Sequence, residues 1–153
     1  MAVAIALHLL AAVIWVGGMF FAYMALRPVV ASLLEPPLRL PLWSQVFARF
    51  FRWVTAAVII LPVTGYWMVF SVLGGMSGVG LHIHLMQGIG IVMILLYGHL
   101  YFGPYRRMQL AIEKQDWKDA GARLAQIRKI VATNLSLGLA VIVIAGSGRY
   151  WVN

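Results

Sequence analysis

Four long runs of apolar residues dominate the pattern of hydrophobic and polar positions along the chain. They cover residues 2–26, 54–73, 79–103 and 130–148. Each is close to the roughly 20 residues that cross the hydrocarbon core of a bilayer as a helix. Because backbone groups in hydrocarbon must hydrogen-bond internally, the runs are predicted to be helices. The pattern therefore predicts an all-α membrane protein, a four-transmembrane-helix bundle in which residues 1–153 form a single domain.

The first run is predicted to stay in the protein as a span. It lacks the basic segment that begins a secretory signal peptide, and it is longer than the short apolar region of such a peptide. Arg27 follows it in place of a small-residue cleavage site.

The cations of the chain are confined almost entirely to two of the three connections between the runs. The first connection and its flanks carry Arg27, Arg39, Arg49 and Arg52. The third connection carries all the other Lys and Arg residues except Arg149, and residues 74–80 carry none. Cytoplasmic loops of membrane proteins collect Lys and Arg. The first and third connections are therefore predicted to be cytoplasmic, and both ends of the chain are predicted to lie outside.

The two basic connections differ in their expected structure. In the third connection, Asp116 is a suitable N-cap for a helix over residues 117–129, which would continue into the fourth run. This pattern predicts a cytoplasmic helical hairpin between the third and fourth spans. The first connection holds four prolines and is predicted to be broken, with a separate interfacial helix over residues 42–53.

Composition supports the membrane assignment and excludes several kinds of chemistry. Hydrophobic residues make up 63% of the chain and charged residues only 10%, whereas about a quarter charged is usual for soluble domains. Cysteine is absent, which excludes disulfides, thiolate metal sites and catalytic thiols. The net charge of +8 is explained by the basic connections, so no nucleic-acid surface is expected.

Histidines are the only residues within the runs that titrate near neutral pH. Ionisable residues inside a membrane are costly to bury and are therefore candidates for function. His8 in the first run and His84 in the third are expected at similar depths below the outer surface, and both are predicted to face the interior of the bundle. His82 on the opposite side of the third helix and His99 near its other end are alternates.

A slot for a flat cofactor is predicted between His8 and His84. Small residues at the same level are Gly65, Gly88 and Gly146, with Trp15 on the same stripe as His8 and Arg149 just above as a partner for an acidic group. Two facing imidazoles beside a slot lined by glycine indicate a b-type haem. The sequence therefore favours haem b used for electron transfer or redox chemistry, and a haem-dependent membrane oxidoreductase is one form that this function would take.

Two other functions remain open. Thioether and imidazole groups suit Cu(I), and Met86, Met76 and Met1 lie near His82 and His84 at the outer surface, so copper binding or transport is the first alternative. The second is a cofactor-free scaffold, in which each histidine is simply a hydrogen-bonded polar residue. The expected partners are the lipid bilayer and an unidentified redox partner or quinone, and self-association is left open.

Three short motifs resemble those of the copper-resistance protein D (CopD)-like membrane proteins of bacteria. They are residues 8–18 with His8, Trp15 and the pair Gly17 and Gly18, residues 81–88, and residues 104–107. The resemblance implies a multi-pass protein of the inner membrane that is linked to copper movement. The similar HemJ proteins are haem-binding protoporphyrinogen oxidases, in which His8 would match the histidine of the first helix. Residues 79–103 lack the lysine expected on the third helix of HemJ proteins, which argues against the oxidase activity itself.

Overall fold

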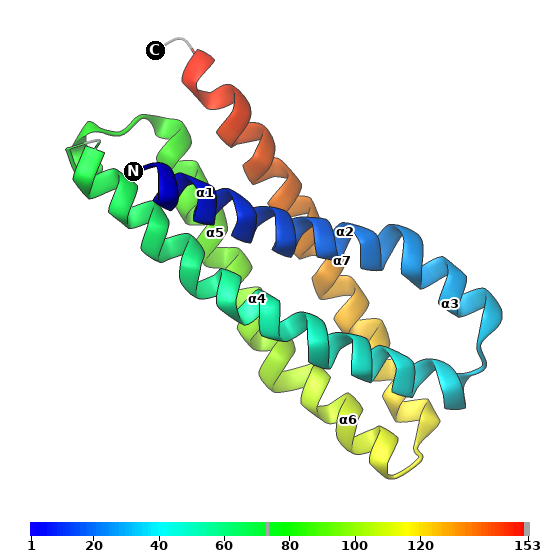
Figure 1. The fold of residues 1–153 in the computed structure, drawn as a ribbon. Coiled ribbons are helices and arrows are strands. Elements are labelled where there is room, and N and C mark those ends of the chain that lie inside the picture. Colours follow the sequence, from blue (N-terminus) through cyan, green and yellow to red (C-terminus); the bar gives the residue numbers. More distant parts are fainter. Residues whose placement is uncertain (73, 152–153) are drawn as a thin grey trace.

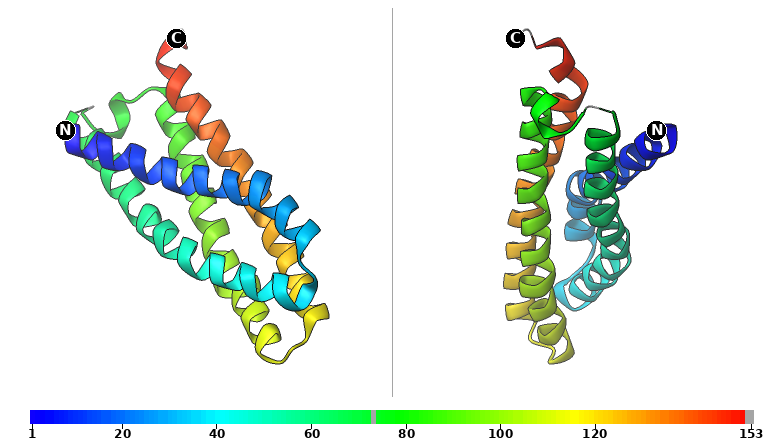
Figure 2. Two further views of the ribbon diagram at one scale, coloured as in Figure 1. Left: turned by 45° about the vertical axis from the view of Figure 1, so that its right-hand side comes forward. Right: turned by 90° about the vertical axis from the view of Figure 1, so that its left-hand side faces the viewer.

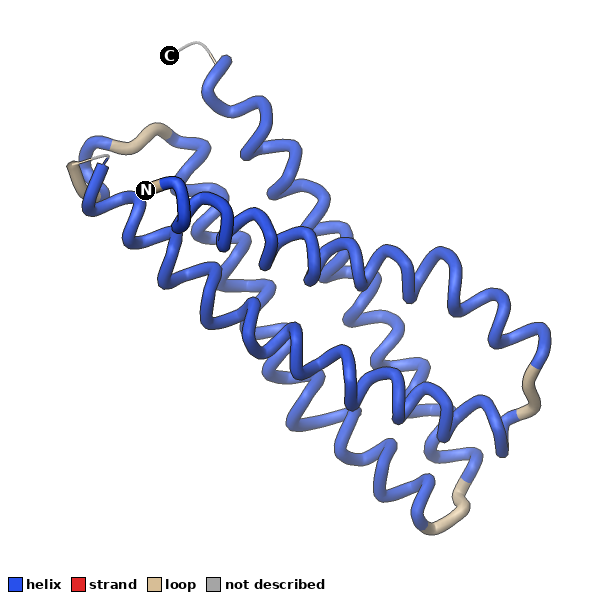
Figure 3. The backbone as a smooth tube through the Cα atoms, viewed as in Figure 1, coloured by secondary structure: helices blue, strands red, loops and turns tan. Residues whose placement is uncertain are grey.

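The computed structural model describes residues 1–72 and 74–151. For Arg149 it describes the backbone but not the side chain. Four long helices contain most of these residues, and they cover Ala2–Leu33, Pro36–Val72, Leu81–Glu113 and Trp117–Ser147 (Figures 1 and 3). All four are long and apolar enough to cross a membrane, and no strand occurs in the described part of the chain. The predicted all-α fold with four transmembrane helices is therefore confirmed, and each helix extends beyond its apolar run or closely matches it.

Wider π-helical turns divide the first and third long helices. The first consists of α1 (Ala2–Ala12), η1 (Val13–Gly17), α2 (Gly18–Phe21), η2 (Ala22–Leu26) and α3 (Arg27–Leu33). The third consists of α5 (Leu81–Leu100), η4 (Tyr101–Tyr105) and α6 (Arg106–Glu113). The second and fourth are α4 (Pro36–Val72) and α7 (Trp117–Ser147), and the short 3₁₀ turns are η3 (Met76–Gly78) and η5 (Gly148–Tyr150). Because Pro104 cannot fit the regular α-helical ladder, the wider turn η4 allows the helix to continue past it.

The long helices pack as two hairpins. α1 lies along α4, while α5 and α6 lie along α7, and Figure 2 shows the two pairs side by side. Residues 74–80, the N-terminus and the last turns of α7 gather at one end of the bundle, which we call the termini end (Figure 1). The opposite end holds the connections at residues 34–35 and 114–116, and we call it the basic end. The assignment of the basic end to the cytoplasm is a prediction from the positive-inside rule.

The predicted helical hairpin at the basic end is present. α6 turns into α7 through residues 114–116, and the side chain of Asp116 accepts a hydrogen bond from the backbone N–H of Asp119 at 3.0 Å. This is the N-cap that the sequence predicted, and it satisfies one of the free N–H groups at the start of the helix. α7 then continues without interruption into the fourth span.

The prediction of a separate interfacial helix over residues 42–53 is wrong. These residues belong to α4, which runs unbroken from Pro36 and includes Pro41 and Pro62. A proline in the first turn of a helix removes an N–H that has no intrahelical partner anyway, so Pro36 and Pro37 do not oppose the start of α4. The face formed by Leu40, Trp43, Phe47, Phe51 and Val54 is buried, which gives the extended helix a continuous packing surface.

The tightest packing lies in the half of the bundle nearer the basic end. The largest fully buried side chains are Leu40, Val54, Met108 and Ile127. An aromatic cluster adds to them, with ring centroids 5.0 to 6.2 Å apart, and it consists of Phe47, Phe51, Tyr97, Tyr101 and Tyr105. The half nearer the termini end is less closely packed, and the functional candidates lie there.

Candidate functional site

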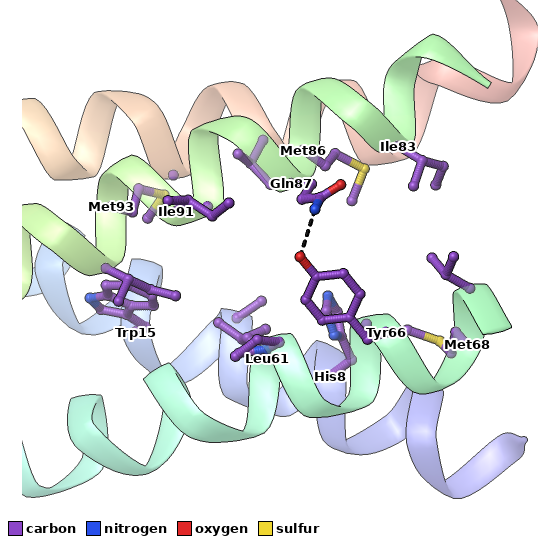
Figure 4. Close-up of a pocket in the computed structure, with 18 of the residues that line it drawn as sticks. His8, Trp15, Leu61, Tyr66, Met68, Ile83, Met86, Gln87, Ile91 and Met93 are labelled. Atoms are coloured by element: carbon purple, nitrogen blue, oxygen red, sulfur yellow. Dashed lines mark hydrogen bonds between the residues drawn. The ribbon is translucent and has the colours of Figure 1, made fainter. Parts of the chain in front are cut away.

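The two hairpins border a cavity of about 310 Å³ in the half of the bundle nearer the termini end. Its walls come from all four long helices and from η3. Figure 4 shows most of the lining residues in a close-up. The lining residues are His8, Ala12, Trp15, Val16, Leu61, Pro62, Gly65, Tyr66, Met68, Val69, Met76, Ile83, Met86, Gln87, Gly90, Ile91, Met93, Ile94, Gly138, Val141 and Ile142. An apolar cavity with a few polar groups is the usual form of a small-ligand site.

His8 is held by a hydrogen bond to α4. Its Nδ1 lies 2.8 Å from Oγ1 of Thr64, and the Thr64 hydroxyl donates its own hydrogen to the carbonyl oxygen of Ile60 at 2.6 Å. With the hydroxyl hydrogen directed to Ile60, the Thr64 oxygen accepts from His8, and this assignment places the imidazole hydrogen on Nδ1. The lone pair of Nε2 is then free to bind a ligand, and this is the usual arrangement of a metal-binding histidine.

Gly65 lies directly against the His8 ring. A Cβ atom at this position would lie 3.4 Å from Cε1 of His8, at the near limit of ordinary contact. The absence of a side chain at Gly65 therefore lets the imidazole of His8 lie close to α4. The role predicted for Gly65, to leave room for a flat cofactor, stays a prediction. Ala12, one turn along from His8, also lines the cavity.

Four methionines line the same cavity as His8. Met68 is on α4, Met76 on η3, and Met86 and Met93 are on α5. Figure 4 shows the side chains of Met86 and Met93 beside the space between α4 and α5. The chain has eight methionines, so half of them lie around this one cavity.

A second polar contact crosses the cavity between α4 and α5. Nε2 of Gln87 donates to the hydroxyl oxygen of Tyr66 at 2.6 Å (Figure 4). The ring of Tyr66 stacks on Phe70, with ring centroids 6.3 Å apart. This contact connects the two hairpins across the cavity.

Trp15 lines the cavity on the side that faces the basic end. Its indole is buried and lies edge-on to Tyr97, with ring centroids 6.4 Å apart. The Tyr97 hydroxyl lies 2.7 Å from Oγ1 of Thr55 and donates to the carbonyl oxygen of Phe51 at 3.1 Å. Trp15 and the aromatic cluster therefore separate the cavity from the basic end.

The expectation that His84 faces His8 across the bundle is wrong. His84 is exposed on the outer surface of α5 and does not line the cavity. The cavity face of α5 contains Ile83, Gln87 and Gly90 instead, so the inward face is rotated by about one residue, roughly 100°, from the predicted one. The physical cause is the packing of α5 on α7, which buries Met93 and other residues on that side.

Several other predicted site residues also lie away from the cavity. Gly88 and Gly146 are exposed, and a Cβ atom at either position would meet no other atom within 4 Å. His82 packs against Gly148 at the end of α7. His99 is exposed near the other end of α5. The side chain of Arg149, the predicted partner of an acidic group, is outside the described part of the structure.

Sequence reasoning did not select Thr64, Tyr66, Met68 and Met93 as site residues. Thr64 and Tyr66 flank Gly65, which was chosen for its small size alone. Both residues place a polar group inside an apolar run, and this feature of the sequence could have marked them as candidates for the site. In the described part of the chain, no group of three or more His, Cys, Asp or Glu residues is placed to hold a metal ion.

Comparison with known proteins identifies the family of this chain. The family model of copper resistance protein D matches residues 44–147, which include α7 up to its last residue and most of α4. No curated protein and no solved structure matches the chain significantly. The matched region excludes α1 and therefore His8, but it contains the cavity residues of α4, η3, α5 and α7. The match covers more than half of the sequence, and this multi-pass membrane protein belongs to the CopD family of copper resistance proteins.

Proposed function

We propose that the protein binds Cu(I) in the cavity between its two hairpins, as a step in handling copper at the membrane. The observation that carries this proposal is that His8, hydrogen-bonded through Nδ1, lines the same cavity as four methionines. Imidazole nitrogen and thioether sulfur are donors that suit Cu(I). In this function the copper ion is the cargo of the protein and not a resident cofactor.

The electrostatics of the cavity also suit a monovalent ion. His8 and the methionines are uncharged ligands, and no Asp, Glu, Lys or Arg is among the described residues that line the cavity. Such a ligand set does not provide the hard oxygen donors that favour Mg²⁺ or Ca²⁺. Cu(I) is the ion of the copper couple that soft, neutral donors stabilise.

The geometry gives less support to a bis-histidine haem. That arrangement needs two imidazoles on opposite sides of one ring, but His84 is on the outer surface of α5, and His8 is the only histidine among the described residues that line the cavity. The Gly88 and Gly146 positions that would widen the slot are also exposed. Copper is therefore the function that the described residues support best.

The test is a Cu(I) titration of the whole chain in detergent under anaerobic conditions, in competition with a coloured Cu(I) chelator. Mutation of a residue that hydrogen-bonds to a metal ligand typically lowers metal affinity about 10–100-fold. His8→Ala removes the ligand itself, so it should lower Cu(I) affinity by at least about tenfold. His84→Ala is the matched control on the lipid-facing surface and should bind Cu(I) like the unmodified protein.

A second pair of variants tests the thioethers. Joint replacement of Met68, Met76, Met86 and Met93 by Leu keeps the volume nearly constant and should remove most Cu(I) binding. Met19→Leu combined with Met24→Leu changes methionines outside the cavity and should have no effect. Unchanged affinity in His8→Ala would overturn the proposal, as would a sharp haem band in the spectrum of the dithionite-reduced protein.

A further inference from the structure

The cavity is not sealed, and it lies at the level of the membrane-spanning helices. Tyr66, Ile91 and Ile142 line it and are 36%, 48% and 47% exposed. These residues lie within the helices that are long and apolar enough to cross a membrane, where lipid surrounds the bundle. The bilayer is therefore the nearest source of a ligand for the cavity.

The size and lining of the cavity exceed what one metal ion requires. Its volume of about 310 Å³ is at the lower end of the range for organic ligands, roughly 300–1,000 Å³. Ala12, Gly65, Gly90 and Gly138, each on a different long helix, line the cavity without filling it. No formally charged side chain is among the lining residues that the structure describes, so the space suits an uncharged and largely apolar molecule.

The contact between Tyr66 and Gln87 leaves hydrogen-bond donors available beside this space. The Tyr66 oxygen accepts from Nε2 of Gln87, and its own hydroxyl hydrogen is donated to no other residue in the described part of the chain. The Gln87 amide has a second N–H that likewise makes no bond to a described residue. Two donors in apolar surroundings favour a ligand with a carbonyl oxygen, because an unbonded polar group is costly there.

We infer that the cavity binds an uncharged, carbonyl-bearing ring compound from the bilayer, of the quinone class. A carbonyl oxygen of the ligand accepts from the Tyr66 hydroxyl, and its ring lies in the apolar space that Ile91 and Ile142 line. This inference does not depend on copper, because its donors are Tyr66 and Gln87, whereas the copper proposal uses His8 and the methionines.

The experiment measures binding of decylubiquinone to the whole chain in detergent by equilibrium dialysis. Gly90→Leu places a large side chain in the cavity at a position where a Cβ atom meets nothing within 4 Å, and it should lower affinity at least tenfold. Gly88→Leu makes the same change on the exposed side of α5 and should have no effect. Equal loss in both variants, or no loss in either, would overturn the inference.

Two further measurements test the hydrogen bond and separate the two proposals. Tyr66→Phe should weaken decylubiquinone binding several-fold, and Tyr23→Phe, which is outside the cavity, should not. Decylbenzene, which has the same tail but no carbonyl group, should compete poorly, and equal competition would indicate simple partition of apolar molecules and overturn the inference. His8→Ala should bind decylubiquinone normally while losing Cu(I), so either proposal can fail without the other.

Discussion

At the scale of single residues, the hydrogen bond between His8 and Thr64 determines which imidazole nitrogen can bind a ligand. Thr64 is buried, and its hydroxyl is oriented by the carbonyl oxygen of Ile60. The bond fixes the direction of the His8 ring, and with the Thr64 hydrogen on Ile60 it favours the tautomer whose hydrogen is on Nδ1. A free imidazole on α1 would have several rotamers and two tautomers, and it would bind a metal ion more weakly.

We predict that Thr64→Val lowers Cu(I) affinity by about tenfold, the lower end of the range for outer-shell partners of metal ligands. Valine has nearly the same shape as threonine but cannot accept the His8 hydrogen. Thr64→Ser retains the hydroxyl and should bind Cu(I) with nearly unchanged affinity. The chelator competition assay measures all three proteins, and equal affinities for Thr64→Val and the unmodified chain would show that the bond does not orient His8.

The sequence predicted the inward direction of His8 but not that of His84. The first helix carries a stripe of small residues and one tryptophan, and the structure places His8, Ala12 and Trp15 of this stripe around the cavity. The third helix has apolar residues on every side, because lipid and neighbouring helices both accept them. Its rotation depends on packing against α7, which the hydrophobic pattern does not contain.

At the scale of elements, the two hairpins approach each other closely beside the cavity at Gly138 of α7. A Cβ atom there would lie 2.8 Å from Cγ2 of Val16 on η1 and 3.2 Å from Cε of Met93 on α5. Valine is restricted in its side-chain rotamers within a helix, so it cannot easily move away. The absence of a side chain at Gly138 therefore lets the helices meet on one side of the cavity.

We predict that Gly138→Ala destabilises the protein by about 1–3 kcal/mol, the usual cost of adding atoms to a packed interior. Gly146→Ala is the control on the same helix, because a Cβ atom there meets nothing within 4 Å. Unfolding in detergent, followed by circular dichroism against temperature or denaturant, compares the two variants. Equal stability of both would mean that the hairpins separate readily at this crossing.

The continuity of α4 could not be predicted from the sequence. The prolines of the first connection predicted a break, and one occurs at residues 34–35, yet α4 then starts at Pro36 and passes Pro41 without ending. Local propensity opposes a helix there, while the buried face that begins at Leu40 favours it. Packing with other helices supplies most of the stability of a helix in a folded protein, so the tertiary contacts prevail over the local signal.

At the scale of the whole molecule, the bundle has a closely packed half and an open half. The packed half lies toward the basic end, and the cavity with His8 lies toward the termini end. By the positive-inside rule the cavity would then be nearer the outer face of the membrane. Copper and a bilayer-dissolved ligand would both reach it from that side or from the lipid.

We predict that the termini end faces outward, because all Lys and Arg residues except Arg149 lie in residues 27–53 and 104–129, which join the apolar runs at the basic end. A reporter enzyme that is active only after export, fused after Asn153, should therefore be active. The same reporter inserted in the turn at residues 114–116 should be inactive, and a reporter that works only in the cytoplasm should give the reverse pattern. Activity of the exported reporter at residues 114–116 alone would place the cavity on the cytoplasmic side, where Cu(I) would reach His8 from inside the cell.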